Sequence, residues 1–120
     1  MATLTTKLTL QSTNTLSDAT NVTTTDTLTV TNPTELSRKS IATGSAQALI
    51  DSNSAYSYAY IKVISGVNAT DFLQVKLAGD ALLKLRVGEF TWLPLYNAIA
   101  ITAESYGGAC VVEYGYWSIA

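Results

Sequence analysis

The sequence predicts an all-β protein, an antiparallel β-sandwich of the jelly-roll type with about eight strands. The first observation behind this prediction is that apolar and polar residues alternate with a period of two along most of the chain. The second is that Gly, Asn and Asp interrupt this alternation roughly every 8–14 residues, as turns between short strands do. The third is length. A chain of 120 residues, 48% hydrophobic and 13% charged, can bury one core, so we expect a single domain.

The composition of the chain changes near residue 32. Residues 1–31 hold 13 of the 18 threonines and no aromatic residue, whereas all eleven aromatic residues lie between positions 56 and 117. Threonine favours strands but contributes little to a core. We therefore expect residues 32–120 to form the sandwich body. The Thr-rich segment 1–31 forms either the first two strands of that sandwich or an arm, and Asn32-Pro33-Thr34 marks a turn at the boundary.

Alternating segments predict the strands of the first half in order. One strand is expected around Leu8 and Leu10 and another around Leu28 and Val30, where apolar residues alternate with polar ones, mostly threonine. Further strands are expected over residues 37–42, 46–50 and 56–64, and a helical turn over residues 45–51 is the alternative for the middle one. In the 56–64 strand, one face is expected to carry Tyr56, Tyr58, Tyr60, Lys62 and Ile64.

The second half predicts five more segments of strand, around residues 73–77, 83–87, 90–95, 99–103 and 110–117. Turns are expected at Gly79-Asp80 and Gly88-Glu89, and Gly107-Gly108 is expected to form a hairpin turn. Pro94 lacks a backbone N–H, so its strand should not occupy the middle of a sheet.

The residues that could carry catalysis are few. Histidine is absent and Cys110 is the only cysteine, which excludes Ser-His-Asp and Cys-His catalysis, histidine or multi-cysteine metal sites and an intrachain disulfide. Cys110 is expected to be a buried apolar thiol. Glu113, inside an apolar strand, is expected to pair with Arg86 or Lys84 or to face a subunit interface. We therefore expect that the protein is not an enzyme and that it binds no cofactor and no metal. Most of the nine carboxylates are expected to be solvated turn residues: Asp51, Asp71, Asp80, Glu89 and Glu104.

Charge and hydropathy limit the partners. A formal net charge of −2 argues against binding to nucleic acid through phosphates. No run of 18 apolar residues and no targeting signal is present, so no membrane partner is expected. We expect the protein to be synthesised in a reducing cytosol.

The aromatic residues are the most informative side chains. Tyr56, Tyr58 and Tyr60 are two residues apart, as are Tyr114 and Tyr116, so each set shares one face of a strand. Tyrosine suits sheet packing, subunit interfaces and sugar stacking, and these three interpretations stay open. Replacing Tyr114 and Tyr116 with alanine is expected to weaken assembly more than folding. The candidate interaction residues are Tyr56, Tyr58, Tyr60, Trp92, Tyr96, Tyr114, Tyr116 and Trp117.

The chain resembles the small all-β structural proteins of tailed-bacteriophage virions, above all capsid decoration (cement) proteins. The resemblance lies in the Met-Ala-Thr-Leu start with its Thr-rich continuation and in three later segments. These are the alternating tyrosines of residues 54–62, Val-Gly-Glu-Phe-Thr-Trp-Leu-Pro-Leu at 87–95 and Val-Glu-Tyr-Gly-Tyr-Trp at 112–117.

The resemblance implies a non-enzymatic protein on the outside of a capsid, present in many copies. Its partners would be the major capsid protein or other virion proteins, and it would be a homo-oligomer, with a trimer favoured by closed symmetry. Two alternatives remain open. One is a tail, fibre or baseplate accessory subunit of the virion. The other is a carbohydrate-binding sandwich module that stacks sugars on Trp92, Trp117 or the tyrosines.

Overall fold

The structure, a computed structural model, describes residues 2–12, 21–30, 36–52, 56–96 and 99–119. These residues form ten strands in antiparallel sheets, which confirms the predicted all-β fold. The described residues contain no helix long and apolar enough to cross a membrane. The strand total is ten instead of about eight: eight strands form the sandwich and two lie outside it. The turn predicted at Asn32-Pro33-Thr34 falls outside the described residues.

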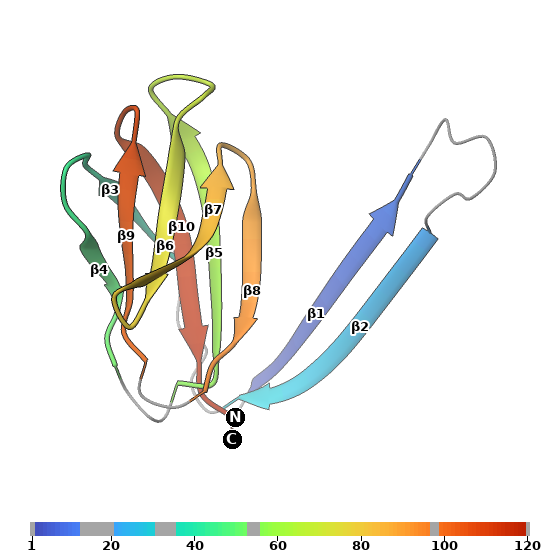
Figure 1. Cartoon of the computed structure of the whole chain (residues 1–120). Coiled ribbons are helices and arrows are strands. Elements are labelled where there is room, and N and C mark those ends of the chain that lie inside the picture. The colour runs from blue at the N-terminus through green and yellow to red at the C-terminus, as the bar shows by residue number, and fades with distance from the viewer. Residues whose placement is uncertain (1, 13–20, 31–35, 53–55, 97–98, 120) are drawn as a thin grey trace.

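The two strands outside the sandwich are β1 (Ala2–Gln11) and β2 (Asn21–Val30), which pair only with each other over their whole length. We call this two-stranded ribbon the arm. Figure 1 shows the arm extending away from the sandwich, with its base beside the chain termini. Val30 is fully buried at that base and forms a bridge with Ile119, so the arm is attached where β2 ends.

The sandwich consists of two four-stranded sheets. The first sheet has the order β3 (Ser37–Ile41), β10 (Cys110–Trp117), β5 (Tyr58–Gly66) and β8 (Phe90–Pro94). The second has the order β4 (Gln47–Ile50), β9 (Ile101–Tyr106), β6 (Phe72–Leu77) and β7 (Asp80–Arg86).

The strand order is that of a jelly roll. β6 pairs with β7, β5 with β8, β4 with β9 and β3 with β10, as in one long hairpin. Rolling that hairpin places alternate pairs in the two sheets, so that β10 pairs with both β3 and β5, and β9 pairs with both β4 and β6. The predicted jelly-roll sandwich is therefore present.

Two local predictions hold and one changes. The strand predicted over 46–50 is present as β4, residues 47–50, so the alternative helical turn over 45–51 is excluded. Gly107 and Gly108 do form a turn, but it connects β9 and β10, which lie in different sheets, so it is not a hairpin. A glycine with positive φ, such as Gly107, indicates a change of chain direction but does not indicate whether the two flanking strands pair with each other. Pro94 lies in β8 at the edge of the first sheet, as predicted.

Alternate residues of both sheets meet in one core. Ile61 and Val63 of β5 face Leu73 and Val75 of β6, and all four side chains are fully buried. Cys110 belongs to the same core with no exposed surface, as its sequence context predicts. Lys39 of β3 donates a hydrogen bond from Nζ to the Ala48 carbonyl of β4 at 2.9 Å, which joins the two sheets at one side.

Asp71 corrects the expectation that the carboxylates near turns are solvated. Asp71 is only 1% exposed, and its Oδ2 accepts a hydrogen bond from the Asn68 backbone N–H at 2.7 Å. Gly107 and Gly108 approach the carboxylate so closely that a Cβ on either would lie within 2.6 Å of one of its oxygens. The burial therefore comes from a loop that is remote in sequence, and we call this contact the Asp71 loop junction.

Glu104 is a second correction, because it lies within β9 and not at a turn. It points outward from the second sheet and forms an ion pair with Lys76 of the neighbouring strand at 3.3 Å. Asp51, Asp80 and Glu89 are exposed, as expected.

Candidate functional site

The arm has one apolar face and one polar face. Side chains alternate across a ribbon, and the register places Leu4 opposite Leu28 and Leu10 opposite Val22 on the same side. That side also carries Thr6, Thr24 and the carboxylate of Asp26, its single charged residue. We call it the arm apolar face, and its apolar members are Ala2, Leu4, Leu8, Leu10, Val22, Leu28 and Val30. The opposite face is polar throughout and consists of Thr3, Thr5, Lys7, Thr9, Gln11, Asn21, Thr23, Thr25, Thr27 and Thr29.

The first sheet has an unusual outer surface. β5, β8 and β10 turn aromatic residues away from the core, because their inward positions are taken by residues such as Ala59, Ile61 and Val112. Trp92 stacks on Tyr58 with ring centroids 5.3 Å apart and lies 5.5 Å from Trp117 at an interplanar angle of 44°. We call this surface the outer aromatic face, and its members are Tyr58, Tyr60, Phe90, Trp92 and Trp117.

Trp117 is only 7% exposed although it belongs to this outer face. Its ring lies over Gly115, where a Cβ would be 3.1 Å from the ring and 2.9 Å from Leu36. The glycine therefore leaves the space in which the indole packs.

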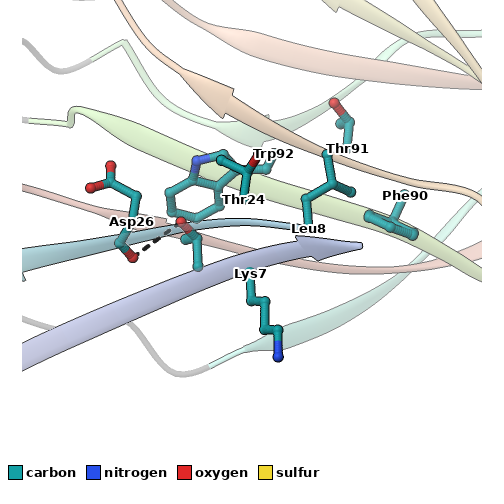
Figure 2. A pocket seen from close by; sticks show the side chains of 8 residues that line it. Lys7, Leu8, Thr24, Asp26, Phe90, Thr91 and Trp92 are labelled. Atoms are coloured by element: carbon teal, nitrogen blue, oxygen red, sulfur yellow. Dashed lines mark hydrogen bonds between the residues drawn. The ribbon is translucent and has the colours of Figure 1, made fainter. Parts of the chain in front are cut away.

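A groove separates the arm apolar face from the outer aromatic face. Its volume is about 460 Å³, and a smaller hollow of about 190 Å³ is lined by Tyr60, Phe90 and Trp92 together with residues of β1. Figure 2 shows Leu8 directed toward β8 and Lys7 directed away from it, as alternation along a strand requires. We call this space the arm groove, and it is lined by Thr6, Lys7, Leu8, Thr24, Asp26, Phe90, Thr91 and Trp92.

Apolar side chains in and beyond the arm groove remain exposed. Leu8 and Leu10 of β1 are 44% and 49% exposed, Val22 of β2 is 46% exposed and Phe90 of β8 is 57% exposed. Exposed apolar residues that gather on facing surfaces are typical of sites that bind another macromolecule or a ligand. An apolar surface that enters the arm groove would be shielded from water by these side chains.

Glu113 provides the negative charge of the outer aromatic face. Its Oε2 accepts from Arg38 at 3.3 Å, and its Oε1 accepts from the Tyr60 hydroxyl at 3.4 Å. The predicted pairing with Arg86 or Lys84 is therefore wrong, because both of those residues belong to β7 of the other sheet. Burial raises the pKa of Tyr60, and the neighbouring charge of Glu113 and the hydrogen bond to it raise that pKa further.

This shift predicts the behaviour of the protein at alkaline pH. A phenol whose pKa is higher in the folded than in the unfolded chain stabilises the fold below the unfolded value of about 10. That stability is lost as the pH rises through the raised pKa. We expect Tyr60→Phe to lose less of its unfolding free energy between about pH 9 and 11.5 than the unchanged protein, as measured by urea unfolding. Tyr96→Phe, at a residue 80% exposed, serves as the control and should follow the unchanged protein. Equal losses of unfolding free energy in the unchanged protein and both variants would contradict a raised pKa of Tyr60.

The predicted interaction residues fall into three groups. Four of them, Tyr58, Tyr60, Trp92 and Trp117, lie together on the outer aromatic face. Tyr96 lies apart and is 80% exposed. Three others pack against the core: Tyr56, Tyr114 and Tyr116.

The last group changes two expectations. Tyr56 precedes β5 and packs against the core, so it does not share the outward face of Tyr58 and Tyr60 as predicted. Tyr114 and Tyr116 share the inward side of β10 with Cys110 and Val112, and the Tyr116 ring lies 4.4 Å from that of Tyr56. Replacing Tyr114 and Tyr116 would therefore damage the core, so that pair does not separate assembly from folding.

Sequence reasoning missed two parts of this surface. Phe90 was not selected, although it shares a face with Trp92 at a spacing of two residues. The apolar residues of the arm were not among the candidate interaction residues either. The alternation of Leu4, Leu8 and Leu10 with polar neighbours was the available signal.

Among the residues that the structure describes, no group of three or more His, Cys, Asp or Glu side chains is placed to hold a metal ion. No protein-family model matches the chain, and no curated protein or solved structure matches it either.

Proposed function

We propose that this protein is a non-enzymatic structural subunit of a bacteriophage virion, of the capsid-decoration type, located on the outer capsid surface. It would bind the major capsid protein or another virion protein and act as a homo-oligomer. The arm and the outer aromatic face would make its contacts. The capsid position and the viral setting rest on the resemblance of the sequence, whereas the contact surfaces rest on the geometry.

The observation that carries the proposal is the unburied arm. Ten-residue strands β1 and β2 form a ribbon with one mainly apolar face, yet three of its large apolar side chains are nearly half exposed. A two-stranded ribbon by itself is only marginally stable in water. An arm of this kind is stabilised by covering its apolar face, which is what assembly into a larger particle provides.

The remaining features are compatible with an assembly subunit. Jelly rolls occur in viral capsid and lectin domains, but this is an analogy of fold alone. Low charge and many aromatic residues suit the centre of a protein interface. Repeated weak contacts on a symmetric surface gain strength through effective concentration, so each copy can use a modest contact area.

The sugar-stacking alternative receives less support from the geometry. Trp117 is 7% exposed, and Trp92 is engaged with both Tyr58 and Trp117. A flat indole face open to a sugar ring is therefore not offered by Trp117.

The first test is copy number. We would purify virions from the source of the sequence and measure the molar ratio of this chain to the major coat protein by quantitative mass spectrometry. A ratio between roughly one third and one supports a capsid decoration protein with regular symmetry. A few dozen copies or fewer would move the protein to the tail, fibre or baseplate, and its absence from virions would overturn the proposal.

The second test addresses the arm. We expect Leu8→Ser with Leu10→Ser to reduce occupancy on particles lacking the native protein by at least tenfold, because burying two leucines contributes about 2–4 kcal/mol. The matched control is Thr9→Ser with Thr23→Ser, which lie opposite each other on the polar face. Equal occupancy of both variants, measured by quantitative gel or mass spectrometry, would show that the arm apolar face makes no contact.

A further inference from the structure

We propose that the arm apolar face of one copy packs on the outer aromatic face of a second copy of this chain, so that neighbouring copies exchange arms. This inference deepens the proposed function and rests on it, because it names the partner of the arm. It is drawn from three features of the structure: incomplete burial, complementary charge and sufficient contact area.

Both surfaces are incompletely covered within one chain. The base of the arm is fixed by the buried Val30 and its bridge to Ile119, while the arm groove separates the middle of the arm from Phe90 and Trp92. Leu8, Leu10 and Phe90 consequently keep 44%, 49% and 57% of their surface exposed. One chain thus carries two apolar surfaces that the arm groove separates, while the arm stays attached to the sandwich at its base.

The charges of the two surfaces are complementary. Asp26 is the single charged residue of the arm apolar face, and its side chain has no ion pair among the described residues. Three charged residues lie on the outer side of the first sheet: Arg38, Lys62 and Glu113.

Of these three, Arg38 is paired with Glu113 at 3.3 Å. Lys62 lies opposite Phe90 in the ladder and forms no ion pair within the described part of the chain. An arriving arm would therefore bring a carboxylate to a face that has one extra cation beside its exposed phenylalanine.

The area that two exchanged arms would cover is also close to that of a stable interface. A ten-residue strand is about 34 Å long and a two-stranded ribbon about 10 Å wide, so the arm covers a footprint of roughly 340 Å². In an exchange, each copy donates one arm and receives another, which covers about 680 Å² per copy. Stable interfaces bury about 800 Å² per partner. A partner that contacted only one of the two surfaces would cover about half of this area.

Charge reversal of the full-length chain tests the exchange. We would prepare Asp26→Lys, Lys62→Glu and the double variant, and measure self-association by sedimentation equilibrium. Each single variant should weaken association at least tenfold, since a like charge then faces each reversed residue. The double variant should recover the association of the unchanged protein.

Mixing the two single variants shows whether the contact lies between chains. In a mixed pair, the arm that carries Asp26→Lys meets the face that carries Lys62→Glu, so opposite charges are restored there. The other arm and the other face keep the native Asp26 and Lys62, which also attract each other. We expect the mixture to associate at least tenfold more tightly than either variant alone. Recovery in the double variant without recovery in the mixture would assign the contact to a single chain and overturn the exchange.

Two further outcomes would also overturn it. One is a protein that stays monomeric at about 100 μM, a concentration well above the Kd of a stable interface of this size. The other is association that does not respond to either reversal. If the unchanged protein nevertheless occurs in virions at high copy number, the proposed function stands and only the arm exchange fails. Circular dichroism of every variant checks that the sandwich is folded.

Discussion

Replacing Trp117 with alanine is expected to destabilise the protein by about 3–5 kcal/mol, the usual cost of removing a large buried aromatic side chain. The indole is 7% exposed, packs against Trp92 and lies over Gly115. Its loss would leave a cavity on the outer aromatic face and remove the neighbour that positions Trp92. Because Trp92 in turn stacks on Tyr58, we expect the whole cluster to loosen.

Urea unfolding, followed by circular dichroism, measures this effect. Tyr96→Ala provides the control, since that ring is 80% exposed and its removal should change the unfolding free energy by less than about 0.5 kcal/mol. Trp117→Phe should lie between the two. A loss below about 1 kcal/mol for Trp117→Ala would mean that the indole is not part of the packed structure.

Replacing Gly107 with alanine is expected to have the second large effect, a destabilisation of about 3 kcal/mol or more. Two costs combine. The backbone at Gly107 has a φ of 90°, where a side chain costs about 1–2 kcal/mol. The new Cβ would also lie 2.5 Å from Oδ1 of Asp71, which is buried and held by Asn68, so the Asp71 loop junction would have to open.

Gly79→Ala separates these two costs. Gly79 has nearly the same φ, 86°, but a Cβ there meets no atom within 4 Å. Its substitution should therefore cost only the backbone contribution of about 1–2 kcal/mol. Equal midpoints for the two variants in urea unfolding would show that the approach of Gly107 to Asp71 contributes nothing to stability.

Much of the sandwich could be predicted because it depends on local patterns. Alternation identified the strand segments, and the missing N–H of Pro94 placed β8 at an edge. The identity of paired strands could not be read in the same way. β10 lies between β3 and β5, which are far from it in sequence, and alternation carries no information about sheet order. The partner of Glu113 was wrong for this reason, since Arg38 reaches it only through the β3–β10 pairing.

The candidate site was predictable in part. The spacing of Tyr58 and Tyr60 placed them on one face, and Trp117 lies on the opposite side of β10 from Tyr116, as alternation along a strand requires. Which side faces the core could not be decided, because both sides of β10 carry aromatic residues. Asp71 was misjudged because its burial depends on Gly107 and Gly108, which pass close to it only in the folded chain.

The nested pairing of the jelly roll has a consequence for how the chain folds. The β6–β7 hairpin closes over a two-residue turn, whereas β3 and β10 are joined by most of the sandwich sequence. Loop closure becomes more costly with separation, so we expect pairing to begin at β6–β7 and spread outward. Because β10 lies between β3 and β5, a chain leaving the ribosome keeps both of these edges open until residue 117 has emerged. The first sheet, which carries the outer aromatic face, is therefore completed only after β10 has emerged, and the proposed arm exchange could begin only then.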